Sequence, residues 1–194
     1  MSSIEYVSNN MEKSNDQYLE IMSVKNVAAA QHFHKSFPQY KTTPLANLKN
    51  LAKYLGLKDI FVKDESYRFG LNAFKVLGGS YAMAKHISTE TGIPVEEMTH
   101  ELLTSKEVKD KLGEVTFYTA TDGNHGRGVA WAAKEIGQKA VVRMPKGTTK
   151  TRLENILKLG AECTIEEVNY DECVRMAAKE SEAREHDVII QDTA

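Results

Sequence analysis

The sequence has few cysteines and no long apolar run, and each shortage excludes a class of protein. Its two cysteines, Cys163 and Cys173, are separated by nine residues and form neither a C-x-x-C pair nor a zinc-type spacing. Buried, reduced thiols are therefore predicted rather than a disulfide. No segment approaches the roughly 18 consecutive apolar residues that cross a bilayer. We expect no membrane partner.

An excess of basic charge is also missing. Lysine and arginine total 25 against 27 acidic residues, which gives a net charge of −2 and a pI near 6.3. Without a basic stripe, a nucleic-acid partner is not expected, and a small-molecule ligand fits better. The first 17 residues are polar and lack the basic-then-apolar pattern of a secretory signal. The absence of a secretory pattern predicts a cytoplasmic enzyme.

The 194 residues, 41% of them hydrophobic, are enough to bury a core in one domain or two small ones. Apolar periodicity predicts a helix over 45–55, a strand over 60–63 and a helix over 73–87, followed by a charged surface connection of helix and loop over 88–113. Beyond it, strands at 115–120, 140–144, 162–168 and 187–191 alternate with helices at 126–136, 149–159 and 170–183. This alternation predicts an α/β fold with a parallel sheet, right-handed crossovers and helices on both faces.

Lys75 follows a strand-like segment and stands where a helix is predicted to begin, in the run Asn72-Ala73-Phe74-Lys75. Turns of this kind are where α/β proteins place ligands, beyond the carboxyl ends of their strands. A lysine amine in such a place can form a covalent bond with a carbonyl cofactor. The alternative is a surface lysine that merely begins an amphipathic helix. The Gly78-Gly79 pair that follows weakens a helix, so we expect another backbone or a ligand close by.

A second turn of the same type occurs at 119–128, with the sequence TATDGNHGRG. Its three glycines allow tight backbone shapes and a close approach to a ligand. Their order does not match the dinucleotide pattern G-x-G-x-x-G, so NAD binding is a weak alternative. His125, within this turn, has no role that the sequence can assign, and Trp131 is most simply a core residue.

Together, Asn-Ala-Phe-Lys at 72–75 and Thr-Asp-Gly-Asn-His-Gly at 121–126 resemble the fold-type II pyridoxal phosphate enzymes, which include tryptophan synthase β and the serine/threonine dehydratases. In most of that group a serine stands directly before Gly-Asn-His, where this chain has Asp122. The aspartate, and the final Gln-Asp-Thr-Ala at 191–194, are similar to the 2,3-diaminopropionate ammonia-lyases. The resemblance runs from about Phe37 to the end of the chain.

This resemblance implies a domain organisation. Residues 1–87 are expected to form the N-terminal part of a large cofactor-binding lobe, 88–190 a smaller βαβ lobe, and 191–194 the start of a return to the large lobe. Relatives of this type are about twice as long, so the resemblance implies a truncated chain that lacks the glycine-rich phosphate cradle and is inactive alone. The alternative is that the chain is a natural protein of this length. A homodimer is also implied by the resemblance alone.

The resemblance also implies the cofactor, pyridoxal 5′-phosphate, and the residues that hold it. Lys75 is expected to bind the cofactor covalently and to act as a base. Asn124, next to Gly123, would offer its amide to the cofactor's 3′ oxygen, which sets the tilt of the ring. The alternative for Asn124 is a turn asparagine that bonds its own backbone.

Two aspartates are the remaining candidate catalytic residues. With Lys75 on one face of the substrate and Asp122 on the other, the α-proton of either the L or the D enantiomer could be removed. Asp192 would stabilise the departing ammonium or bind a substrate amine. Its alternative role is a strand-end aspartate that caps the next turn.

The resemblance thus predicts α,β-elimination of 2,3-diaminopropionate to pyruvate and ammonia by a pyridoxal phosphate-dependent carbon–nitrogen lyase. Two alternatives are a serine/threonine dehydratase and a non-catalytic binding module. No metal is expected, because His32 and His34 form an H-x-H without further ligands nearby.

Overall fold

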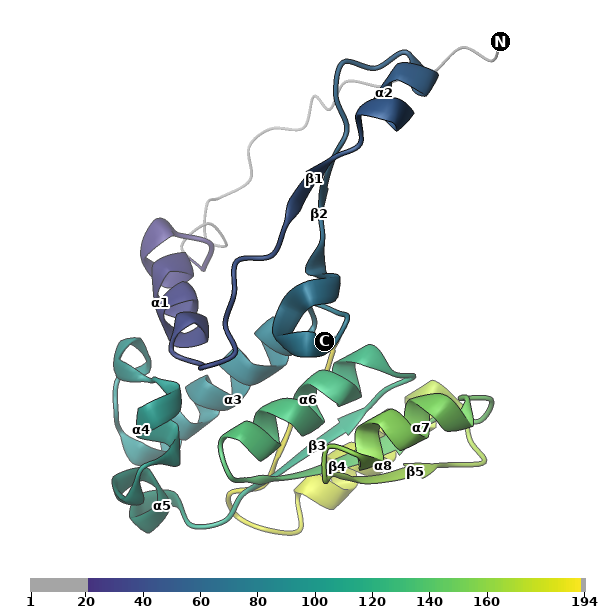
Figure 1. The fold of residues 1–194 in the computed structure, drawn as a ribbon. Helices are drawn as coiled ribbons and strands as arrows, with labels where there is room; N and C mark the ends of the chain where they lie inside the picture. Colours follow the sequence, from purple (N-terminus) through teal and green to yellow (C-terminus); the bar gives the residue numbers. More distant parts are fainter. Residues whose placement is uncertain (1–20, 193–194) are drawn as a thin grey trace, which may run out of the picture.

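The computed structural model describes residues 21–192 (Figure 1). The predicted polar leader, residues 1–17, lies outside them. The N-terminal half contains α1 (Val24–Lys35), β1 (Leu45–Asn47), α2 (Lys49–Leu55), β2 (Phe61–Lys63), the 3₁₀ segment η2 (Glu65–Gly70), α3 (Val76–Thr91), η3 (Val95–Glu97), α4 (His100–Thr104) and α5 (Lys106–Leu112). The C-terminal half contains β3 (Thr116–Ala120), α6 (Asn124–Glu135), β4 (Lys139–Met144), α7 (Lys150–Leu157), β5 (Glu162–Ile165), α8 (Tyr170–Ser181) and β6 (Val188–Ile189).

The C-terminal half forms a parallel four-stranded sheet in the order β5-β4-β3-β6. In its register, Phe117 of β3 lies opposite Ala140 of β4 on one side and Val188 of β6 on the other. The chain moves outward from β3 to β5 and then returns past β3 to form β6. Right-handed crossovers therefore require α6 and α7 on one face and α8 on the other, as Figure 1 shows. The predicted fold class is confirmed.

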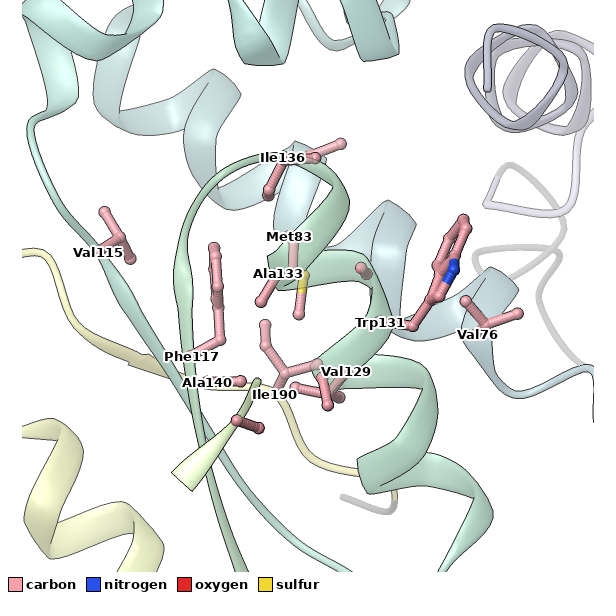
Figure 2. Close-up of a cluster of buried hydrophobic side chains, with 14 of the residues drawn as sticks. Val76, Met83, Val115, Phe117, Val129, Trp131, Ala133, Ile136, Ala140 and Ile190 are labelled. Carbon is pink, nitrogen blue, oxygen red and sulfur yellow. The ribbon is translucent and has the colours of Figure 1, made fainter. Parts of the chain in front are cut away.

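The core lies between this sheet, α6 and α3 (Figure 2). Phe117 from β3, Met83 from α3 and Val129 from α6 are each completely buried. Ile190, directly after β6, is also buried in this cluster. Because α3 contributes to the same core as the sheet, the helix that begins beside Lys75 is held rigidly against α6.

The backbones of α3 and α6 approach each other closely at Gly128. A Cβ atom built at Gly128 would lie 2.9 Å from the Cα atom of Val76 and 3.0 Å from its backbone nitrogen. A backbone cannot move aside as a flexible side chain can, so only glycine allows this approach. Val76 directly follows Lys75, which means that this contact fixes the position of the lysine.

The segment over 45–63 forms an arm that projects from the rest of the molecule (Figure 1). The prediction of one helix over 45–55 is wrong in its first part, because residues 45–47 form β1 and pair antiparallel with β2. The Leu48 amide still donates to the Ile60 carbonyl at 2.8 Å, so the helix begins only at Lys49. It ends as predicted at Gly56, which adopts a left-handed conformation with φ 69°.

Two other predictions need correction. The second helix begins at Val76 rather than at 73, because Asn72 has a φ of +56° and cannot continue a helix. The segment 88–113 consists of helices and loops, as predicted, because it completes α3 and contains η3, α4 and α5. It does not lie wholly on the surface, since Met98, Leu103 and Val108 are buried. The sequence did not indicate this burial, because these helices are short and strongly charged and their apolar faces are narrow. The division into a large and a small lobe stays a prediction.

No helix among residues 21–192 is both long and apolar enough to cross a membrane.

We predict that Gly128→Ala destabilises the protein by about 1–3 kcal/mol, because the added methyl group would overlap the backbone of Val76. Gly78→Ala is the matched control. It also lies in a helix, but apart from its chain neighbours and the adjacent turns of its own helix backbone, no atom lies within 4 Å of the position that its new methyl group would take. It should therefore be neutral or stabilising by up to about 1 kcal/mol. Urea unfolding of both variants measures the difference, and equal midpoints would contradict the close-contact account.

Candidate functional site

The chain between β2 and Lys75 contains two residues other than glycine in the left-handed conformation. Phe69 and Asn72 both have positive φ, at 49° and 56°. A bulky residue such as Phe69 rarely adopts this conformation, so its surroundings must hold it there. Its ring is buried and stacks on Trp131 of α6 with a centroid separation of 4.7 Å. The sole tryptophan is thus a core residue, as predicted, and it fixes the approach to Lys75.

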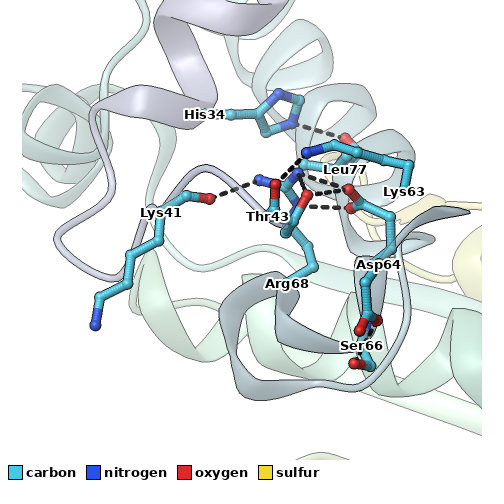
Figure 3. A network of polar contacts seen from close by, with 9 residues as sticks. His34, Lys41, Thr43, Lys63, Asp64, Ser66, Arg68 and Leu77 are labelled. Carbon is cyan, nitrogen blue, oxygen red and sulfur yellow. Dashed lines mark hydrogen bonds and ion pairs between the residues drawn. The ribbon is translucent and has the colours of Figure 1, made fainter. Parts of the chain in front are cut away.

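A polar network anchors the same segment at η2 (Figure 3). The buried guanidinium of Arg68 donates to Glu65 through Nε (2.8 Å) and Nη2 (3.0 Å), and to the Thr43 hydroxyl through Nη2 (3.2 Å). The Lys63 amine donates to the Thr43 carbonyl. This network joins the chain before β1, the end of β2 and η2, so that the arm and the approach to Lys75 share one anchor.

Lys75 lies at the N-terminus of α3, and its Nζ forms an ion pair with Oδ2 of Asp192. Asp192 comes three residues after β6 and is 117 positions away in the sequence. The two side chains are 37% and 28% exposed, so both remain accessible to a ligand. Both line a cavity of about 420 Å³, whose other walls are Phe74, Leu77, Gly78, Gly79, Ala82, His125, Ile190 and Gln191. The structure therefore brings together two of the predicted site residues, and it places the predicted Gly78-Gly79 pair beside them.

His125 is a member of this site to which the sequence assigned no role. Its ring is 5% exposed; Nε2 lies 2.8 Å from the Ile190 carbonyl and Nδ1 lies 3.7 Å from Oδ1 of Asp192. Both partners are more than 60 residues away in the chain, directly after the strand beside β3. No local pattern around His125 could have indicated them.

The turn after β3 is built around Thr121. Its buried hydroxyl accepts hydrogen bonds from the amides of Gly123 (3.0 Å) and Gly126 (3.2 Å). A Cβ atom at Gly126 would lie 2.3 Å from Cγ2 of Thr121, so this glycine is required by packing. The threonine therefore folds the loop tightly enough to start α6 at Asn124.

Asp122, Gly123 and Asn124 lie outside the residues that line the Lys75 cavity in the described chain. The Asp122 side chain is 73% exposed and turns toward Arg152 of α7, with Oδ2 3.6 Å from Nη1. The same Nη1 donates to the Asp122 carbonyl at 2.9 Å. Asn124 is exposed at the start of α6. Sequence reasoning missed Arg152, whose contact depends on how α7 packs.

The histidine pair and the two cysteines to which the sequence assigned no catalytic or metal-binding role do not line the Lys75 cavity. His34 is buried, with Nε2 2.9 Å from the Leu77 carbonyl, whereas His32 is exposed. Among residues 21–192, no three His, Cys, Asp or Glu side chains gather as metal ligands would. Cys163 and Cys173 are buried free thiols, as predicted, and burial raises the pKa of Cys163 to about 12.

The sheet topology explains why these residues meet. Strand order reverses between β3 and β6, and the crevice at such a reversal, at the carboxyl ends of the strands, is where open α/β sheets bind ligands. The turn 121–124 leaves one side of this crevice, and Asp192 leaves the other.

Residues 37–194 match the family model described as "Pyridoxal-phosphate dependent enzyme".

The chain belongs to the pyridoxal-phosphate dependent enzyme family.

Comparison with known relatives shows which members of this family the chain resembles. The diaminopropionate ammonia-lyase of Salmonella typhimurium is 52% identical over 162 residues, which are 84% of this chain and 40% of that protein. The apo crystal structure of the Escherichia coli diaminopropionate ammonia-lyase superposes with a TM-score of 0.82 at 45% identity, covering 90% of this chain and 46% of the other. A biosynthetic L-threonine dehydratase of Pasteurella multocida is 29% identical over 77% of the chain.

The chain thus spans less than half the length of the diaminopropionate ammonia-lyases that it matches. The family predicted from the two turns is confirmed, and the relatives at 52% and 45% identity belong to the branch that the aspartate at 122 indicated.

The Arg68 network predicts a pH dependence of stability. The hydrogen bond from Arg68 lowers the pKa of Glu65, against an opposing contribution from burial. Because the folded-state pKa lies below the unfolded value of about 4.3, the stabilisation is fully present above that value and is lost as the pH falls through the folded pKa. Glu65→Gln should cost about 1–3 kcal/mol at pH 7, and its deficit should shrink below pH 4.

Urea unfolding at pH 7 and at pH 3 measures this effect. Glu154→Gln is the control, because the Glu154 side chain is exposed on α7, and it should follow the parent protein at both pH values. A Glu65→Gln deficit of the same size at both pH values would contradict the charge-assisted network.

Proposed function

We propose that this chain holds pyridoxal 5′-phosphate at Lys75 and forms part of a lyase that eliminates ammonia from 2,3-diaminopropionate. One observation carries the proposal: an accessible lysine amine is ion-paired with a carboxylate on the wall of a cavity, at the point where the strand order reverses. The similarity to diaminopropionate ammonia-lyases supports the choice of substrate.

The cavity fits such a cofactor. The Lys75 side chain is 37% exposed and lines a space of about 420 Å³, large enough for a substituted pyridine ring. Lys75 would hold the cofactor. Gly123 and Asn124 do not line the cavity, but they directly precede His125, which does, so they would contact the part of the cofactor that extends beyond the cavity toward the turn after β3. When bound, the cofactor supplies an aldehyde that condenses with amines and a ring that withdraws electrons from the substrate α-carbon.

Lys75 and Asp192 work as a pair in this proposal. An ammonium group is not nucleophilic, so Lys75 must give up a proton before it can react with a carbonyl or act as a base. Asp192 holds the charged form in position through the ion pair. Once Lys75 is neutral, Oδ2 of Asp192, which Lys75 occupies in the ion pair, can bind another cation such as a substrate ammonium group.

Asp122 would act on the other face of the substrate. Arg152 fixes the loop by its hydrogen bond to the Asp122 carbonyl, while the carboxylate remains largely exposed. A carboxylate in this place can accept the α-proton of the D enantiomer, as Lys75 does for the L enantiomer. The activity would then extend to both enantiomers.

The elimination balances without an oxidant. The α-proton is removed, the bond between the β-carbon and its nitrogen breaks, and the electron pair leaves with the nitrogen. Because the nitrogen departs as ammonia only if it is already protonated, a carboxylate that stabilises the ammonium favours the step. The remaining enamine is hydrolysed by one water molecule to pyruvate and a second ammonia.

We also propose that the active protein is a cytoplasmic homodimer.

A chimera tests the proposal most directly. In it, this chain replaces the matching part of the E. coli diaminopropionate ammonia-lyase, which it resembles at a TM-score of 0.82. We expect the chimera to bind pyridoxal phosphate and to release pyruvate from diaminopropionate faster than from serine. A faster reaction with serine would instead favour a dehydratase. A folded chimera that binds no cofactor would favour a non-catalytic module.

Asp122→Asn in the chimera tests the role of the aspartate. Removal of a general base typically costs 10²–10⁴-fold in rate, so turnover of D-diaminopropionate should fall by about that factor while turnover of the L form falls much less. Asp171→Asn on α8, an exposed aspartate outside the site, is the control. Equal losses for both enantiomers would contradict the two-faced arrangement.

A further inference from the structure

The ring of His125 has a defined donor and acceptor. The Ile190 carbonyl, 2.8 Å from Nε2, can only accept a hydrogen bond, so Nε2 carries a proton. In the neutral ring, Nδ1 then has a lone pair, and this lone pair lies 3.7 Å from the Asp192 carboxylate. Two acceptors facing each other are unfavourable, and a proton on Nδ1 converts the contact into an ion pair.

Asp192 therefore lies between two basic groups. Its Oδ2 pairs with the Lys75 amine and its Oδ1 faces Nδ1 of His125. When Lys75 is charged and His125 is neutral, the net charge of Lys75, Asp192 and His125 is zero. When Lys75 is neutral, the same net charge is kept only if His125 takes up a proton.

We propose that His125 is a positioning residue that gains a proton at Nδ1 when Lys75 loses one, so that Asp192 always has one cationic partner. The step balances, because one proton leaves Nζ of Lys75 and one arrives at Nδ1 of His125. Asp192 is 28% exposed, which lets solvent exchange the proton. The catalytic use of this device rests on the proposed function, but the proton coupling itself does not.

The charges around the ring support this assignment. Lys75 approaches from α3 and Asp192 from the segment after β6. On α6 itself, the guanidinium of Arg127 donates to the Leu71 carbonyl, and in the preceding turn Asp122 is paired with Arg152. Within residues 21–192, Asp192 is thus the one carboxylate within 4 Å of a His125 ring nitrogen.

The position of His125 beside Asp192 also explains how the Asp192 carboxylate would keep its orientation during a reaction. With a buried, hydrogen-bonded imidazolium on one side, the carboxylate keeps its position when the lysine amine is withdrawn into a covalent bond. Without that partner, an uncompensated carboxylate would be free to rotate toward solvent. His125 would thus hold Asp192 toward the cavity.

Nitrogen NMR of this chain, labelled with ¹⁵N at histidine and free of pyridoxal phosphate, tests the coupling. Ring ¹⁵N shifts report both the tautomer and the protonated fraction, and His125→Gln assigns the signals. We expect a proton on Nε2 in the neutral ring. At one neutral pH, Lys75→Met should raise the ratio of protonated to neutral His125 at least about threefold, and Asp192→Asn should lower it at least about threefold.

His86 is an internal control, because its Nε2 also lies near a carbonyl, that of His186, at 3.1 Å. Its signals should be unchanged in both variants. A His125 ratio that stays the same in Lys75→Met, or a neutral ring protonated at Nδ1, would overturn the proposal. Because the measurement needs no cofactor, its failure is distinguishable from failure of the chimera to release pyruvate.

In the chimera, the same coupling predicts a change in the pH profile. His125→Gln should shift the pH dependence of kcat for diaminopropionate, whereas a residue that only packs would lower kcat equally at every pH. A uniform decrease would contradict the positioning role, even if the variant binds the cofactor normally.

Discussion

The arrangement depends on one close contact, between the backbone of Val76 and Gly128. Lys75 directly precedes that contact, and the residue that allows it lies four positions after Asn124 on α6. With a side chain at 128, α3 would have to move away from α6, and the lysine would move with it. A glycine in a helix interior weakens the helix, so its presence here indicates that the position of Lys75 matters more than the stability of α6.

Around this contact, the topology of the sheet gathers the charges. Because β6 returns to the far side of β3, Asp192 leaves the sheet beside the N-terminus of α6, which carries His125. A meander without this reversal would have separated them. The two sides of the crevice differ in exposure: Lys75, Asp192 and His125 share a cavity, whereas Asp122 faces outward and is paired with Arg152.

The sequence predicted the parallel sheet and the family well, because both follow from local signals: apolar periodicity and two short turns with distinctive residues. It failed where distant contacts decide. Residues 45–47 look helical, but pairing with β2 makes them a strand. The start of α3 is delayed by the left-handed Asn72. His125 and Arg152 were missed because their partners, Ile190 and Asp122, become neighbours only after the sheet and α7 have packed.

The central claim is that Lys75 is the amine that reacts with pyridoxal phosphate. Borohydride reduction of the cofactor-loaded chimera, followed by peptide mass mapping, tests it most directly. The account predicts the added phosphopyridoxyl mass on the peptide that contains Lys75, and none on that peptide after Lys75→Ala. A modification carried by other lysines, with Lys75 unmodified, would contradict the account.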